Sequence, residues 1–168
     1  MNDPFARLPE VPAFTVTSTS VEDGAPFADA QRAGKDLSPQ LSWSGAPEGT
    51  QSYAVTVYDP DAPTGSGFWH WAVADIPASV TSLAEGAGDD TGSGIPDGAY
   101  QLPNDARLAR YIGAAPPAGH GPHRYVIVVH ALGTAKIGIP AEATPAYLGF
   151  NIAGHILGRA VLTATAEN

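Results

Sequence analysis

Glycine and proline interrupt this chain so often that it has little room for long regular elements. The 168 residues contain 19 glycines and 16 prolines, spread along the chain without an internal repeat. That usage is above average, yet 43% of the residues are hydrophobic, a share that a disordered chain would lack. The two features together favour many short strands joined by tight turns. We therefore expect one domain, residues 1–168, that is mainly β, with antiparallel sheets packed together and one or two peripheral helices.

Charge and missing residue types limit the partners. A net charge of −9 argues against nucleic acid and anionic membrane surfaces, although a local field can still hold one small anion in a pocket. The chain has no cysteine, which excludes disulfides and thiolate metal sites and fits the cytoplasm. Residues 1–10 do not read as a secretory signal, and no apolar run reaches the roughly 18 residues of a membrane span. We expect a cytoplasmic protein without stable membrane insertion.

The clearest predicted strand runs from Ser52 to Tyr58 and alternates its side chains with a period of two. This period places Asp59 at the end of an apolar stripe, and Pro60 stops the hydrogen-bond ladder directly after it. A carboxylate is therefore expected where an apolar strand meets a loop.

The next predicted strand is Trp69–Ile76, and its alternation puts His70 on the face of Ala72 and opposite Trp71. The connection of residues 62–67 is short enough for a hairpin, which would bring Asp59 and His70 to the same end of a sheet. A carboxylate beside an imidazole fixes its tautomer and raises its pKa, so we expect this pair to aim the other ring nitrogen of the histidine at a ligand.

Further elements follow from the same patterns. Tyr125–Leu132 is β-branched and nearly all apolar, so it should be a central strand covered on both faces. Thr144 reads as an N-cap, followed by a helix from Pro145 to about Leu157. Shorter strands are expected at Phe14–Ser20, Leu37–Trp43 and Ala160–Thr165.

His123 precedes the central strand and shares the face of Tyr125, so it can supply a second donor. Loop amides near Ala114 and Ala115 can supply more, because Gly113 and the paired prolines stiffen that loop. Such a set suits phosphate, sulfate or acetate. A charge-assisted hydrogen bond contributes about 1.5–3 kcal/mol, and two or three would hold an anion at roughly millimolar to micromolar strength.

Other polar residues have plainer interpretations. A single histidine at a strand end is usually a structural hydrogen-bonding group, and we assign His120, His130 and His155 that role. His155 falls within the predicted helix. Arg124 is expected to pair with an acidic neighbour and hold the loop.

Longer motifs occur in order along nearly the whole chain: Ser38-Pro39, Asp59 to Pro63, Gly67-Phe68-Trp69-His70-Trp71, Ile76-Pro77, Gly113 to Pro117, and His123-Arg124-Tyr125. In this order they resemble the phosphatidylethanolamine-binding protein family, and more closely its bacterial, Raf-kinase-inhibitor-like branch. Many relatives have Gly or Cys in the loop before the paired prolines, where this chain has Ala114 and Ala115, whose methyl groups are expected to narrow the pocket.

The resemblance implies an antiparallel β-sandwich-like core with a small anion-binding pocket at one end. Members bind phosphate-type head groups, some inhibit kinases or proteases, and no catalytic activity or cofactor is expected. It also implies a homodimer, for which the Trp-rich strand could serve as the interface. The pocket residues that carry over are Asp59, Asp61, Pro63, His70, Ala115, Pro116, His123 and Tyr125.

Three functional hypotheses stay open at this point. The first is a non-enzymatic protein that binds a small anion or a phosphorylated head group. The second is an interaction module whose pocket reads a phosphorylated partner or regulates a kinase or protease. The third is a metal-dependent hydrolase, because one carboxylate and two imidazoles can form a facial metal site.

Overall fold

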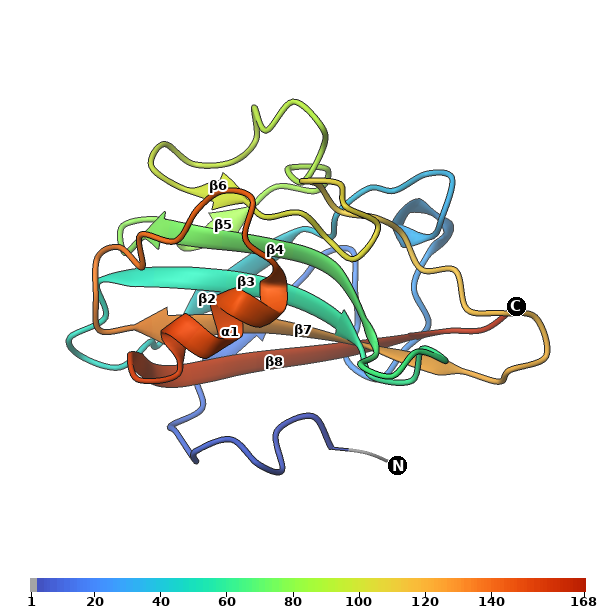
Figure 1. Cartoon of the computed structure of the whole chain (residues 1–168), viewed down its shortest axis with the longest axis horizontal. Coiled ribbons are helices and arrows are strands. Elements are labelled where there is room, and N and C mark those ends of the chain that lie inside the picture. The colour runs from blue at the N-terminus through green and yellow to red at the C-terminus, as the bar shows by residue number, and fades with distance from the viewer. Residues whose placement is uncertain (1–2) are drawn as a thin grey trace.

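Two antiparallel sheets of unequal size build the protein, and its computed structural model describes residues 3–168 (Figure 1). The smaller sheet has the order β1-β2-β5 and the larger the order β6-β4-β3-β7-β8. The small sheet consists of β1 (Thr15–Thr17), β2 (Leu41–Ser44) and β5 (Ser82–Leu83). The large sheet consists of β3 (Ser52–Asp59), β4 (Phe68–Pro77), β6 (Tyr100–Gln101), β7 (His123–Leu132) and β8 (Ile156–Ala166). The expectation of a mainly β, antiparallel fold is confirmed.

Both faces of the large sheet are buried near its centre. Side chains of β3 alternate between two hydrophobic clusters, with Val55 and Val57 in the cluster between the sheets and Ala54 in the other. The second cluster lies beneath α1 (Pro145–Ile152), which covers the outer face (Figure 1). Strand β7 lies between β3 and β8 and is buried along most of its length, as its apolar sequence predicts.

The helix begins as predicted but ends sooner. Thr144 caps it, because its side-chain oxygen accepts the N–H of Tyr147 at 3.1 Å. It ends at Ile152 rather than near Leu157, since the chain turns and pairs with the whole of β7 from Ile156 onward. The placement of His155 in a helix was wrong, and this residue lies in the turn. A short 3-10 helix at Asp29–Gln31 is the second helical element.

A β-bulge changes which face His70 uses. Val57 pairs with Trp71 and Tyr58 pairs with Trp69, so His70 is an extra residue without a direct partner on β3. Strict alternation put it opposite Trp71, and that expectation was wrong. The bulge turns both side chains to the inner face of the sheet, where His70 approaches the end of the inter-sheet core.

The two tryptophans of β4 differ in their exposure. Trp71 is fully buried in the inter-sheet core, and its indole N–H donates to Gln101 at 2.7 Å. Trp69 is half-buried and packs against Tyr58, with 4.3 Å between the ring centroids. Trp71 is therefore a core residue, and a homodimer with its interface at the Trp-rich strand stays a prediction.

Within residues 3–168, no helix combines the length and the hydropathy that crossing a bilayer requires.

Buried His130 makes the stability depend on pH. Burial lowers the pKa of His130 to about 3, so the unfolded chain binds a proton below pH 6.5 that the folded chain does not. Stability should therefore fall as the pH drops from 6.5, by up to about 1.4 kcal/mol per pH unit from this residue. Urea denaturation of the wild type and of His130→Leu between pH 6.5 and 4.5 checks this. The variant should have the flatter profile, and parallel profiles would contradict the assignment.

Candidate functional site

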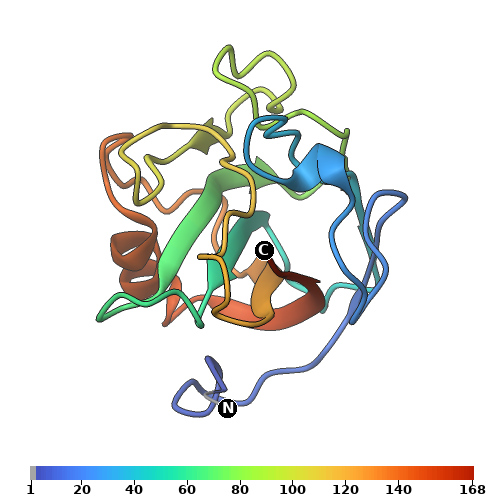
Figure 2. The same ribbon diagram turned by 90° about the vertical axis from the view of Figure 1, so that its right-hand side faces the viewer.

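A cavity of about 210 Å³ opens at one end of the sandwich, where loops gather around the ends of β3, β4 and β7 (Figure 2). The β3–β4 turn supplies one side, and residues 112–117, here called the wall segment, supply another. The lining residues are Asp59, Ala62, Pro63, Thr64, Phe68, His70, Ile112, Gly113, Ala115, Pro116, Pro117, His123 and Tyr125. The fold thus brings seven of the eight predicted site residues to one cavity.

The eighth, Asp61, does not line the cavity. Its carboxylate accepts three hydrogen bonds from Arg124, at 3.0 Å from the main-chain N–H and at 2.8 and 2.7 Å from the guanidinium. These hydrogen bonds hold the pKa of Asp61 below its usual value. The expected pairing of Arg124 with an acid is confirmed. Asp61 therefore ties the β3–β4 turn to the start of β7, and its role as a ligand contact stays a prediction.

The partner of Asp59 is His123, not His70. His123 Nδ1–H donates to Asp59 Oδ2 across 2.8 Å, and Asp59 Oδ1 accepts the main-chain N–H of Asp61 at 2.8 Å. On the far side of the ring, His123 Nε2 shares a hydrogen bond of 2.8 Å with Nδ1 of exposed His120. The expectation that Asp59 orients His70 was wrong, because β7 pairs with β3 and delivers His123 to the end of β3 directly.

His70 is oriented by the main chain instead. Its Nδ1–H donates to the carbonyl oxygen of Ile112 at 2.8 Å. A carbonyl can only accept, so the neutral ring keeps its proton on Nδ1, and Nε2 has no hydrogen-bond partner among the described residues. Burial lowers the pKa of His70, although the Ile112 hydrogen bond and the charge of Asp59 oppose this. The ring is therefore neutral at pH 7.

Tyr125 places an unused hydroxyl at the same cavity. Its ring centroid lies 5.1 Å from that of His70 and 5.3 Å from that of Phe27. The hydroxyl is buried and makes no hydrogen bond of ordinary geometry within residues 3–168. Burial, followed by the charge of Asp59, raises the pKa of Tyr125, so the O–H keeps its proton and remains a donor.

The wall segment is held by the residues around the 3-10 helix. Ala33 N–H donates to the carbonyl of Ala114 at 3.0 Å, and Ala114 N–H donates to the carbonyl of Gln31 at 3.1 Å. The main-chain N–H of Ala114 therefore already has an acceptor, so it is not one of the free donors predicted for this loop. These bonds press Gly113 against the backbone of Arg32, where a side chain has no space.

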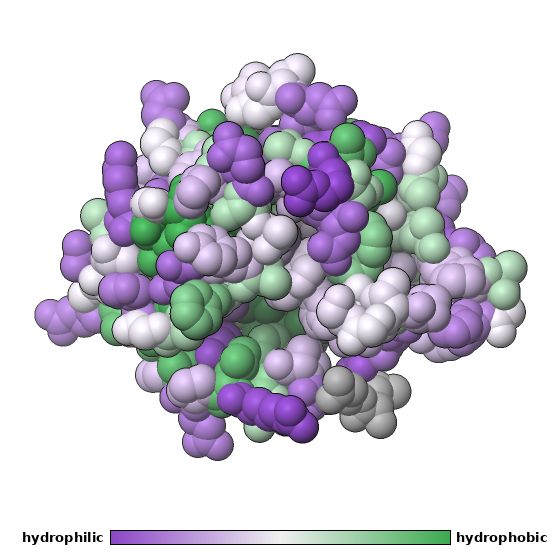
Figure 3. All heavy atoms as spheres, viewed as in Figure 1, coloured by the Kyte–Doolittle hydropathy of each residue, from purple (hydrophilic) through white to green (hydrophobic). Residues whose placement is uncertain are grey.

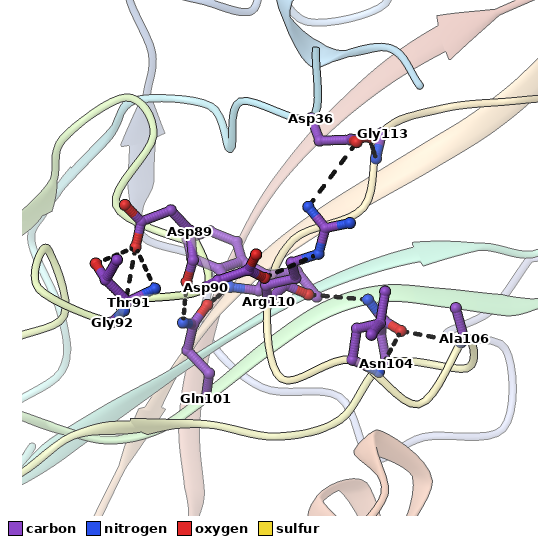
Figure 4. A network of polar contacts seen from close by, with 12 residues as sticks. Asp36, Asp89, Asp90, Thr91, Gly92, Gln101, Asn104, Ala106, Arg110 and Gly113 are labelled. Atoms are coloured by element: carbon purple, nitrogen blue, oxygen red, sulfur yellow. Dashed lines mark hydrogen bonds and ion pairs between the residues drawn. The ribbon is translucent and has the colours of Figure 1, made fainter. Parts of the chain in front are cut away.

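An ion-pair network braces the wall segment from the other side (Figure 4). Asp36 accepts the main-chain N–H of Gly113 at 2.7 Å and lies 3.9 Å from the guanidinium of Arg110. Arg110 also pairs with Asp90 at 3.1 Å. Because Arg110 and Gly113 flank the carbonyl group that orients His70, the network fixes that carbonyl in place.

Two contributors to the site were not predicted. His120 was assigned a structural role, although its three-residue spacing from His123 across a Gly-Pro turn was a usable signal. The other is the carbonyl of Ile112, a main-chain group that leaves no trace in the side-chain pattern. His130 and His155 lie outside the cavity.

The described part of the chain holds no group of three or more His, Asp or Glu side chains arranged for a metal ion. Asp59 and His123 already use their facing atoms on each other, and the second nitrogen of His123 is bonded to His120. Few ligand atoms are left free for a metal.

Comparison with known proteins gives a consistent family. The sequence profile described as phosphatidylethanolamine-binding protein matches residues 17–167. YbcL of Escherichia coli K12 is 45% identical over 161 residues, which are 92% of this chain and 88% of YbcL. YbhB of the same organism is 46% identical over 131 residues, which are 78% of this chain and 82% of YbhB.

A crystal structure agrees with the sequence comparison. The structure of E. coli YbcL, described as a new member of the mammalian PEBP family, superposes with a TM-score of 0.90 at 43% identity. The superposition covers 92% of this chain and 98% of the YbcL chain.

Gly113 offers a test of the wall segment. In Gly113→Ala the new methyl group would overlap the carbonyl group of Arg32, so backbone must move and we expect a loss of about 1–3 kcal/mol in unfolding free energy. Gly65→Ala is the matched control, because nothing lies near its Cβ position. Urea denaturation of both variants measures the difference. Equal stability of the two would contradict the tight packing described above.

Proposed function

The chain belongs to the phosphatidylethanolamine-binding protein family, and from that membership we propose that the cavity at the sheet end binds a small oxyanion, free or as part of a phosphorylated ligand, without catalysing a reaction. One observation carries the proposal. Two imidazoles meet at the cavity, and each already uses its Nδ1–H on a protein acceptor, Ile112 for His70 and Asp59 for His123. Their Nε2 atoms are therefore the positions at which a ligand can be bound.

Binding of the oxyanion requires the protein to take up a proton. Neutral His70 presents a lone pair on Nε2, so an anion binds there only when this nitrogen takes up a proton. The charge-assisted hydrogen bond to the anion offsets the free energy that protonation of His70 costs. The buried carboxylate of Asp59 accepts the Nδ1–H of His123 at 2.8 Å and so orients the Nε2 of that ring.

Neighbouring groups complete the ligand contacts. The hydroxyl of Tyr125 is a buried donor without a partner in the described chain. An oxyanion that reaches Nε2 of His123 replaces His120, whose side chain is exposed and free to move into solvent. The ligand would thus exchange one surface hydrogen bond for several inside the cavity.

The size of the cavity limits the ligand. At about 210 Å³ it is smaller than the ~300–1,000 Å³ of sites that enclose drug-sized molecules. It suits a phosphate or sulfate group rather than the acyl chains of a lipid. A phosphorylated head group would therefore enter with its phosphate alone.

A binding role fits the lining better than catalysis does. No serine or cysteine lines the cavity, and the hydroxyl of Thr64 is hydrogen-bonded to the carbonyl of Gly67. A lining with no activated nucleophile favours capture over turnover. Regulation of a kinase or protease would use the same contacts, with the phosphate carried by a protein.

NMR titration with sulfate tests the site directly. Sulfate should shift the ring signals of His70 and His123, and His70→Ala should weaken its affinity about ten-fold or more, because one charge-assisted hydrogen bond is lost. His155→Ala is the control, since that histidine is exposed and outside the cavity. Unshifted signals of both cavity histidines at saturating sulfate would refute the proposal.

Competition identifies the source of the phosphate. Inorganic phosphate, glycerophosphoethanolamine and a phosphoserine peptide should each displace sulfate from the same histidines. The ligand with the greatest affinity then separates a head-group site from a phosphoprotein site.

The affinity for sulfate should also depend on pH. Because burial lowers the pKa of His70, binding at neutral pH requires proton uptake, and affinity should rise as the pH falls. Uptake of one proton corresponds to about a ten-fold change in sulfate affinity per pH unit. The affinity levels off at the pH where the ring of the ligand-free protein is already protonated. Sulfate keeps its charge over pH 4–8, so calorimetry in this range isolates the protein. A profile of the same slope in His70→Gln would show that another group takes the proton.

A further inference from the structure

A second and larger cavity lies on the opposite face of the five-stranded sheet. Its volume is about 620 Å³, against about 210 Å³ for the first, and no residue lines both. Figure 3 looks onto this face and shows a hollow with apolar residues at its floor. The two cavities are therefore separate sites with the sheet between them.

Apolar and aromatic side chains dominate the lining. Val126 and Val128 of β7 belong to the floor, and α1 contributes small residues such as Gly149, which leave the space open. Tyr58 and Trp69, packed together at 4.3 Å between ring centroids, add aromatic surface. The volume lies within the ~300–1,000 Å³ of pockets that enclose small organic molecules.

The N-terminal segment, residues 3–9, runs beside β8 without joining the sheet (Figure 1), and its residues line one side of this cavity. Its main-chain hydrogen bonds are internal, as between Leu8 N–H and the carbonyl of Phe5 at 2.8 Å. Arg159 of β8 makes two contacts with the segment. Its Nη1–H donates to the carbonyl of Pro9 at 3.0 Å, and its guanidinium lies 5.9 Å from the ring centroid of Phe5.

Two polar atoms at this cavity lack the partners that buried groups need. Nδ1 of His130 and Nε of Arg159 are buried, and neither makes a hydrogen bond within residues 3–168. His130 is 8% exposed, and its other nitrogen lies 3.3 Å from the hydroxyl of Thr56. No carboxylate of the described chain lies within ion-pair distance of Arg159. With the Thr56 hydroxyl donating to Nε2, the neutral ring of His130 carries its proton on Nδ1, so both unpaired atoms are donors. Unpaired buried donors are costly, so they mark a place where a ligand acceptor would be stabilised.

We propose that this second cavity binds a small amphiphilic anion, with one carboxylate head bound by Arg159 and His130 and an apolar body packed between β7, α1 and the N-terminal segment. The proposal does not depend on the oxyanion pocket at the sheet end. It assigns the unpaired Nε–H of Arg159 and the unpaired ring nitrogen of His130 to one ligand group.

The local charge supports an anionic head group. The charged residues of the lining are Arg159, Arg7 and Asp3, so the cavity carries more positive than negative charge in a chain of net charge −9. The carboxylate of Asp3 accepts the main-chain N–H of Phe5 at 2.8 Å and is exposed. Burial lowers the pKa of Arg159, and burial together with the positive charge of Arg159 lowers the pKa of His130.

Calorimetry with decanoate and with 1-decanol tests the proposal on the full chain. Decanoate should bind saturably with one site, and Arg159→Gln should weaken it about ten-fold or more while leaving decanol unchanged, because only the carboxylate uses the guanidinium. The indole signal of Trp69 should shift with decanoate, and the ring signals of His70 and His123 should not.

Gly149→Phe provides a second variant, in case Arg159→Gln alters the fold. Nothing lies near the Cβ position of Gly149, and replacing a helical glycine does not lower helix propensity, so the variant should fold and fill the cavity. It should abolish decanoate binding and leave sulfate binding at the first pocket intact. Loss of decanoate binding with sulfate binding retained would show that the two ligands use different sites, so each proposal is tested on its own.

Several results would overturn the inference. Decanoate that does not saturate, that binds Arg159→Gln equally well, or that competes with sulfate would each rule out the site. Sedimentation velocity addresses the rival occupant, a second copy of the chain. A dimer that Gly149→Phe dissociates, together with absent decanoate binding, would assign this face to self-association instead.

Discussion

Strand β3 is paired on both edges, and the geometry of the whole molecule depends on that constraint. Its neighbours β4 and β7 run antiparallel to it, so the end of β3 meets the beginning of both. Asp59, His70 and His123 therefore gather at one end of the sheet although up to 64 residues separate them in sequence. The hydrophobic burial of β3 on both faces makes this register the one that satisfies core and ladder together.

The buried carboxylates at the sheet end have partners, whereas two buried nitrogen atoms on the outer face have none among the described residues. At the sheet end, Asp59 is paired with His123, and Asp61 with Arg124, so the carboxylates have charge-assisted partners. On the outer face, Arg159 lies over apolar surface without an acid beside it. Burial of an unpaired polar group is costly. This rule explains the close pairing of the carboxylates at the sheet end, and it predicts a missing ligand group beside Arg159 on the outer face.

The two cavities differ in ways that follow from their position. The first lies where loops converge, so its walls depend on main-chain bonds and on the close contact of Gly113 with Arg32. The second lies over the middle of the sheet, so its floor is formed by regularly alternating strand residues such as Val126 and Val128. A convergent polar end suits a compact oxyanion, and a broad apolar face suits a ligand with a hydrocarbon body.

Local pattern determined much of this protein without help from the fold. The alternation of side chains predicted β3 and β7, and Thr144 predicted the start of the helix. The order of the motifs identified seven residues that line the cavity. Tertiary structure alone decided that Asp59 bonds His123 rather than His70, that a bulge turns His70 inward, and that residues 3–9 line a cavity. The reason is that a bulge, a main-chain acceptor such as the carbonyl of Ile112 and a contact across 150 residues between Pro9 and Arg159 depend on register and packing, which no short stretch of sequence specifies.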